Sequence, residues 1–246
     1  MSATTAVLKT ETRLFLREPG ALFWVFAFPT LLLLVLGLMP PFREPNDTLG
    51  GRRVIDLYVP ICVLLALITA GLQAMPPVLA GYRERGILRR MSTTPVRPSA
   101  LLLAQIVLHF AAALGSALLV IVSGRLAYGV DLPAGPLGYL LALILLALGV
   151  LALGSTIGAL SRTAKAASAV ASVAFFPAMF ASGVWMPVQT MPGTLRRVVE
   201  LTPFGAASEA LNQATAGDWP DASHLGVTAL WAVLLTAAAA RWFRWE

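Results

Sequence analysis

Residues Leu57–Ala80 read LYVPICVLLALITAGLQAMPPVLA, a run of twenty-four residues without a charged side chain. A helix rises about 1.5 Å per residue, so about twenty residues cross the roughly 30 Å hydrocarbon core of a bilayer. Lipid admits only helices and closed barrels, and this run is too long for a barrel strand. Five similar runs of 18 to 25 residues accompany it: Ala21–Met39, Ala100–Val122, Pro136–Leu160, Ala166–Met186 and Ser223–Ala240. The sequence therefore predicts an all-α polytopic membrane protein with six transmembrane helices in a single domain, residues 1–246.

The composition supports this prediction. Only 12% of the 246 residues are charged and 58% are hydrophobic, whereas about 25% of the residues in a soluble domain are charged. Cys62 is the single cysteine and lies within a predicted span, so an intramolecular disulfide is excluded. The first apolar run is too long for a signal peptide and has no small-residue cleavage site before Pro40, so no cleavable leader is expected.

The distribution of basic residues predicts the orientation. The N-terminal segment, the second and fourth loops and the C-terminal tail carry twelve of the 18 Lys and Arg residues, and the alternate loops carry six. Because basic residues favour the cytoplasmic side, both termini are expected in the cytoplasm. The same rule accounts for the net charge of +6, so no nucleic-acid partner is expected.

The second loop, residues 82–99, begins YRERGILRRMSTTPVRP and carries five arginines between two apolar runs. Tyr82–Met91 can form a short helix, which the prolines after it would end. A rigid basic helix on the cytoplasmic side suits the docking of a soluble partner. The candidate docking residues are Arg83, Glu84, Arg85, Gly86, Leu88, Arg89, Arg90, Thr94 and Pro95.

Residues 1–20 are expected to form a helix along the cytoplasmic membrane surface. Lys9, Arg13 and Arg17 share one helical face opposite an apolar side, although Glu11 and Glu18 interrupt that side. The alternative is an ordinary positively flanked entry into the first span.

The region 187–220 is long and semi-apolar for a simple connection. Its prolines, Pro203 among them, divide it into two short helices, roughly Gly193–Leu201 and Phe204–Ala214. Trp185 and Trp219 bracket the region as indoles do near headgroups, so helices dipping into the outer leaflet are expected. A helical surface loop is the alternative.

Small and polar residues within the spans favour helix packing over a polar pathway. Pro76 and Pro77 should kink the second helix. His109 is the exception worth testing, because an ionisable group at membrane depth is a functional candidate. The stripes are Gln105, His109 and Ser116 on the third helix and Ser168, Ser172 and Ser182 on the fifth, with the pair Gly154 and Gly158 on the fourth.

Two segments carry a family resemblance. ERGILRRMSTTPVRP resembles the coupling loop of type-two ABC export permeases, in which Glu-Arg-Gly-(Thr or Ile)-Leu precedes Thr-Pro. FFPAMFASGVWMPVQTMPGTLRRVVELTPFGAASEALN is similar to the family's fifth helix, its Gly-x-x-x-Pro turn and its two outer-leaflet helices, with Pro203 between them. The chain departs from the family at EALNQ, where an arginine is frequent.

The resemblance implies a permease subunit in a bacterial cytoplasmic membrane that works as a homodimer or with a homologous permease. Two copies of a separate ABC ATPase would bind the coupling loop and hold the ATP and Mg²⁺. The cargo would be hydrophobic or amphipathic, such as a drug, an antibiotic or a lipid, or alternatively a lipid-linked polysaccharide. The candidate pathway or dimer seam, beside the second and fifth helices, comprises Gln105, His109, Ser168, Ser172, Ser182, Gly183 and Pro203.

The chain itself carries no phosphate-binding loop, since neither Lys9 nor Lys165 lies in a G-x-x-x-x-G-K-[ST] frame. We therefore expect a translocator with no catalytic residue, no bound cofactor and no metal. Ser182 and His224 faintly resemble the pair of a rhomboid protease, but Phe180 replaces the first glycine of its G-x-S-G motif. A membrane scaffold is the third class, and it would not need the charged loop.

Overall fold

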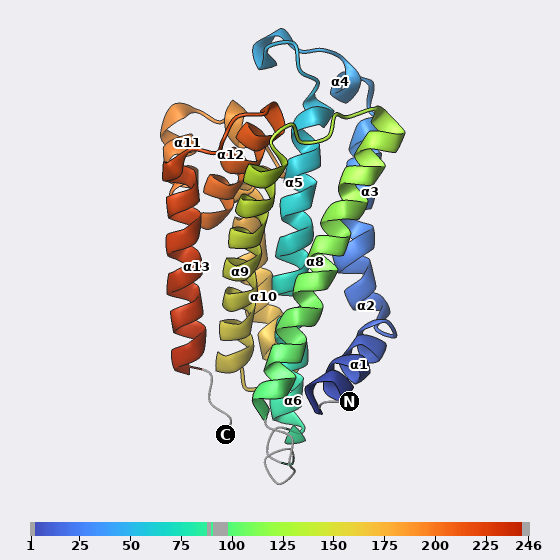
Figure 1. Ribbon diagram of the computed structural model, residues 1–246, viewed down its shortest axis with the longest axis vertical. Helices are drawn as coiled ribbons and strands as arrows, with labels where there is room; N and C mark the ends of the chain where they lie inside the picture. Colours follow the sequence, from blue (N-terminus) through green and yellow to red (C-terminus); the bar gives the residue numbers. More distant parts are fainter. Residues whose placement is uncertain (1–2, 88–89, 91–97, 243–246) are drawn as a thin grey trace.

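The computed structural model describes residues 3–87, 90 and 98–242, and this part of the chain contains helices and no β-strand. Six helices in it are long and apolar enough to cross a membrane, which confirms the predicted polytopic all-α fold. They stand side by side as a bundle (Figure 1). The first span joins α2 (Pro19–Leu22), the π-helical turn η1 (Phe23–Ala27) and α3 (Phe28–Leu38); the second joins α5 (Val54–Ile68), the π-helical turn η3 (Thr69–Ala74) and α6 (Met75–Glu84); the others are α8 (Pro98–Tyr128), α9 (Pro136–Leu160), α10 (Ala164–Ala181) and α13 (Ala222–Trp242).

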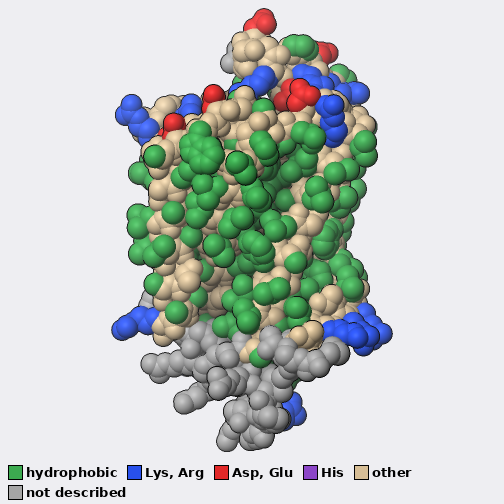
Figure 2. Space-filling view, in the orientation of Figure 1, with side chains coloured by type: hydrophobic (Ala, Val, Ile, Leu, Met, Phe, Trp, Pro, Cys, Tyr) green, Lys and Arg blue, Asp and Glu red, His purple; other side chains and the backbone are tan. Residues whose placement is uncertain are grey.

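Short helices cover the two ends of the bundle. α1 (Ala3–Phe15) lies beside α6 and α8 at the end that carries both chain termini, here called the terminal end (Figure 1). α11 (Gly193–Glu200) and α12 (Pro203–Ala216) cover the opposite end, here called the distal end, and confirm the two predicted short helices to within about two residues. α4 (Pro40–Arg43) and the 3₁₀ turns η2 (Asp47–Leu49) and η4 (Val188–Thr190) complete the described elements. Apolar side chains cover the middle of the face in Figure 2, and charged side chains gather toward the ends.

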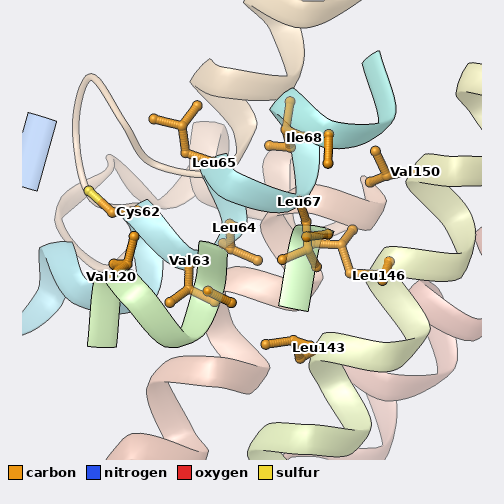
Figure 3. Packing of buried hydrophobic residues seen from close by; sticks show 14 of the residues in the cluster. Cys62, Val63, Leu64, Leu65, Leu67, Ile68, Val120, Leu143, Leu146 and Val150 are labelled. Carbon is orange, nitrogen blue, oxygen red and sulfur yellow. The ribbon is translucent and has the colours of Figure 1, made fainter. Parts of the chain in front are cut away.

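The second span is the centre of the bundle. Every residue from Leu57 to Leu72 is buried, on all faces of the helix, and α5 packs against α3, α8, α9 and α12. Leu143, Leu146 and Val150 of α9 approach it from one side, and Val120 approaches from another (Figure 3). A helix that is apolar all round is satisfied either by lipid or by other helices, and here other helices surround it.

A proline explains the polar contact between the first and third spans. Pro29 has no N–H, so it cannot donate to the carbonyl of Val25 four residues earlier. Ser116 of α8 donates its hydroxyl to that carbonyl at 2.5 Å. Satisfying a freed backbone carbonyl is necessary where no water reaches, so this polar residue connects helices, as the sequence predicted.

Glycines let the second and fourth spans approach closely. A Cβ added to Gly154 would overlap the carbonyl oxygen of Gly71, and one added to Gly158 would lie 2.9 Å from the Cβ of Leu79. The predicted role of the Gly154–Gly158 pair in close packing is therefore confirmed.

We expect Gly154→Val to destabilise the bundle by about 3 kcal/mol, because the new side chain must displace backbone at Gly71. For a chain of this length that is a fall of roughly 6–12 °C in the midpoint of thermal unfolding. Gly226→Val is the matched control, since a Cβ at Gly226 of α13 meets nothing within 4 Å. Equal midpoints for the two variants would contradict the packing assignment.

Candidate coupling segment and translocation site

The end of α6 is fastened to the connection between α9 and α10. Arg83 donates from Nη1 to the carbonyl oxygens of Ala159 and, at 3.5 Å, Ser161. Glu84 accepts from the backbone N–H of Ala164, the first residue of α10, at 2.9 Å. The candidate docking residues Arg83 and Glu84 therefore join the second, fourth and fifth spans at the terminal end.

A turn at Arg85 and Gly86 interrupts the helix predicted over Tyr82–Met91, and Ile87 and Arg90 beyond the turn are again helical. α6 ends at Glu84, and Gly86 has a φ of 64°, in the left-handed region that favours glycine. Arg85 places its guanidinium 5.7 Å from the centroid of the Tyr82 ring, and Arg90 donates from Nη2 to the Arg85 carbonyl at 3.1 Å. Leu88, Arg89, Thr94 and Pro95 lie outside the described residues.

This attachment is suited to transmitting movement. Arg85 and Arg90 are exposed at the terminal end, where a soluble partner has access. A force on the segment acts at once on the start of α10 and the end of α9 through the hydrogen bonds of Arg83 and Glu84. Such charge-assisted hydrogen bonds are stronger than neutral ones, so the segment and the three spans should move together.

A cavity of about 410 Å³ opens beside this attachment, between the first, second and fifth spans. Between Leu57 and Tyr82 the second span is buried except at Gln73, Pro77 and Val78, and all three line this cavity. Neighbouring helices cover the rest of this stretch, so a pathway beside the second helix could contact it only here. Between Leu57 and Tyr82, only the portion that starts at Gln73 of η3 is open.

An apolar stripe lies on the exposed face of α10, which packs against the first span at Trp24. Trp24, which lines the cavity, contacts Phe175 of α10 with ring centroids 6.1 Å apart. Val173 is 74% exposed and Phe176 is 60% exposed, and with Val170 and Phe180 they form the α10 stripe. Their spacing of three or four residues places them on one helical face.

The small residues predicted for the seam divide into two groups. Ser168 is exposed and Ser172 is half-buried on α10. Ser182 and Gly183 are buried at the distal end, where Gly183 has a φ of 92° and ends the helix before Val184. These two residues form a turn inside the chain's own packing. The fifth span therefore ends at Ala181, five residues before the predicted end at Met186.

Ser182 also lacks the geometry of a protease nucleophile. Its hydroxyl donates to the carbonyl of Met179 in its own helix, at 2.9 Å. His224 has its ring Nδ1 3.9 Å from Asp221.

Pro203 starts α12, where the Thr202 hydroxyl accepts from the Gly205 N–H at 3.1 Å and caps the helix.

Gln105 and His109 do not lie on the α10 stripe. Both are 1% exposed and face α1, where Gln105 donates from Nε2 to the Glu11 carboxylate at 2.5 Å. Tyr82 donates to the same carboxylate oxygen at 2.5 Å. Burial raises the pKa of Glu11, and the two hydrogen bonds oppose that shift. The sequence showed Glu11 only as an interruption of an apolar face, and its partners are 71 and 94 residues away.

A second buried carboxylate lies at the distal end and was not predicted. Glu209 of α12 is 3% exposed and lies 3.3 Å from the Arg196 guanidinium of α11. Burial raises the pKa of Glu209, against the lowering effect of Arg196. Arg196 also pairs with Glu200 of its own helix at 2.6 Å, and its contact with Glu209 joins the two distal helices. The EALNQ stretch of α12 has no arginine, and Arg196 of the preceding helix places its guanidinium beside α12 instead.

Within the described ranges, no three His, Cys, Asp or Glu side chains gather closely enough to hold a metal ion. Residues 2–215 match the family model described as ABC-2 type transporter. No curated protein matches the chain.

Proposed function

Because the chain belongs to the ABC-2 type transporter family and is the membrane subunit of an ABC transporter, we propose that it exports a hydrophobic or amphipathic cargo using a separate ATPase. The family match covers most of the chain. The observation that carries the proposal further is the attachment of Arg83 and Glu84 to the ends of three spans. An ATPase that pulls on this segment would move the helices that border the 410 Å³ cavity.

The cavity suggests the class of cargo. Its walls combine apolar residues, such as Trp24, with the amide of Gln73 and the charges of Glu18 and Arg85 at its mouth. Ligand sites typically pair mainly apolar walls with a few polar groups that orient the ligand. A drug-sized or lipid-like amphiphile fits this combination.

The pathway is proposed to run between two copies of the chain. The bundle fills its own centre with the second span, so a conduit inside one copy would have to displace a packed core. The α10 stripe and the exposed face of α3, with Val35 57% exposed, remain for a second permease. Two ATPases would then bind the two coupling segments, each holding its own ATP and Mg²⁺.

We expect the terminal end to face the cytoplasm of a bacterium, since it carries most of the basic residues. A membrane-impermeant maleimide applied to intact cells should label Thr194→Cys at the distal end and leave Arg162→Cys unlabelled, both in a Cys62→Ala background. Both positions are exposed on the bundle, so access depends on the membrane. After permeabilisation both should label. The reverse pattern in intact cells would invert the orientation and exclude cytoplasmic coupling.

Transport itself tests the function. Cells that carry the chain and its ATPase should accumulate amphipathic dyes several-fold less than cells that lack either subunit. Loss of the ATPase and loss of the permease should have the same effect, because neither moves cargo alone. Unchanged accumulation across a panel of hydrophobic and amphipathic compounds would reject this cargo class.

A further inference from the structure

A second cavity lies between α1, α6 and α8, and it shares Glu18, Ala21, Val78 and Arg85 with the 410 Å³ cavity. Its volume is about 320 Å³, which is roughly ten times the 30 Å³ that one liquid water occupies. Glu11, Tyr82, Gln105 and His109 line its polar side, whereas Leu14 and other apolar side chains line the rest. Phe15 packs edge-on against the His109 ring, with ring centroids 5.6 Å apart.

The buried polar atoms that lack a partner in the residues lining this cavity are hydrogen-bond acceptors. Gln105 uses its NH₂ group on Glu11, so its Oε1 is left as an acceptor. The His109 Nδ1 lies 2.9 Å from the carbonyl oxygen of Gln105, which can only accept, so in the neutral ring Nδ1 carries the hydrogen and Nε2 accepts. Neither Gln105 Oε1 nor His109 Nε2 has a partner among the described residues, although both atoms are buried.

Unpaired buried acceptors are costly, so a donor is expected to fill the site. Three of the residues that line the cavity carry acceptor groups, and one of them, Glu11, is a carboxylate. A primary ammonium group carries three N–H donors and a positive charge, and therefore matches both the number and the charge of these groups. A trimethylammonium group has the same charge and no donor.

The rim of the cavity suits the rest of an amphiphile. Arg17 and Arg85 line it with exposed guanidinium groups that can bind a phosphate, beside the exposed carboxylate of Glu18. α1 directly precedes the first span, which begins at Pro19, so the cavity lies near the level of lipid headgroups. Leu14 is 51% exposed and offers an apolar surface for a chain that extends into the bilayer.

We propose that this cavity binds the primary ammonium group of an amphiphile, held by Glu11, Gln105 and His109. An ethanolamine phospholipid would also place its phosphate at Arg17 and Arg85, whereas a simple amphiphilic amine would use the acceptors alone. Because α1 and α6 both line the cavity, the occupant would bridge the surface helix and the span that leads into the coupling segment. This binding does not depend on whether the chain exports cargo.

The test uses the full chain in detergent. Native mass spectrometry measures retention of phosphatidylethanolamine and phosphatidylcholine with identical acyl chains. Thermal unfolding compares dodecylamine with dodecyltrimethylammonium. We expect about tenfold preferential retention of the ethanolamine lipid. Of the two cations, only dodecylamine should raise the midpoint of thermal unfolding. Selectivity in both assays indicates that the ammonium suffices. Selectivity only among the lipids shows that the phosphate is required, and selectivity only for dodecylamine identifies a phosphate-free amine as the ligand.

Two variants locate the site. His109→Phe keeps the ring volume and removes the acceptor, and Glu11→Gln removes the charge. Each should reduce amine selectivity several-fold, whereas Glu200→Gln at the distal end should not. If His109→Phe does not fold, Glu11→Gln provides the same test. The proposal is overturned if neither assay distinguishes primary from methylated amines, as expected of a cavity that holds only water, or if both folded variants keep full selectivity.

Discussion

The double variant Arg85→Glu/Arg90→Glu is expected to lose at least tenfold in ATPase retained per permease, and to lose export of every cargo alike. Both side chains are exposed at the terminal end, on the segment that α6 holds against α9 and α10. Reversing two charges at a docking surface places like charges together, which costs several kcal/mol. The measurement is the amount of ATPase that co-purifies with a tagged permease, together with cargo accumulation in the same cells.

The matched control is Arg162→Glu/Lys165→Glu. These residues are also basic and exposed at the terminal end, Arg162 in the connection between α9 and α10 and Lys165 in the first turn of α10, so the change in net charge is the same. We expect this control to keep most of its ATPase. If the control lost as much ATPase as the first variant, the effect would come from the general charge of this end. If the first variant kept both its ATPase and its export, the coupling assignment would be wrong.

The second large effect is expected at the α10 stripe. Val173→Glu/Phe176→Glu should abolish pairing of two permeases and reduce export at least tenfold. A symmetric pair brings the same surface of each copy together, so two added carboxylates become four at the contact. Desolvating like charges there opposes association, and the packing of the exposed Phe176 ring is lost as well.

Leu230→Glu/Val233→Glu provides the control for this effect. Leu230 and Val233 are 57% and 65% exposed on α13 and have the same three-residue spacing, so both double variants carry a similar cost of placing glutamates at a bilayer-facing surface. Mass photometry in nanodiscs should show that the control variant still forms pairs of permeases and that the stripe variant does not. A stripe variant that still pairs and exports would place the contact between copies on another face.

The spans could be predicted from sequence because their signal is local. Leu57–Ala80 has no charged residue over a length that crosses a bilayer, and the five other runs repeat that property. Which span becomes central could not be predicted in the same way. Lipid and protein are both apolar surroundings, so hydropathy does not distinguish the enclosed second span from the lipid-facing sixth. The close approach of Gly71 to Gly154 lets the fourth span pack directly against the second.

The polar sites depended on partners distant in the chain. Glu11 interrupts an apolar helical face, and only the positions of Tyr82 and Gln105 show that the carboxylate is buried and bonded. Ser116 is similar, since its acceptor is freed by Pro29 in another span. For the coupling segment, the sequence indicated that a basic segment follows the second span. It did not indicate the turn at Gly86, because a glycine in a short basic run also occurs within helices.

ATP-driven transport by purified components tests the central claim most directly. The permease and its ATPase are reconstituted together into liposomes, and an amphipathic dye is followed as it enters vesicles whose ATPase faces outward. We expect dye accumulation that requires ATP, Mg²⁺ and both subunits, and that fails with Arg85→Glu/Arg90→Glu while the matched Arg162→Glu/Lys165→Glu complex still transports. Accumulation by the permease alone, or accumulation indifferent to ATP, would contradict a transporter driven by a separate ATPase through this segment.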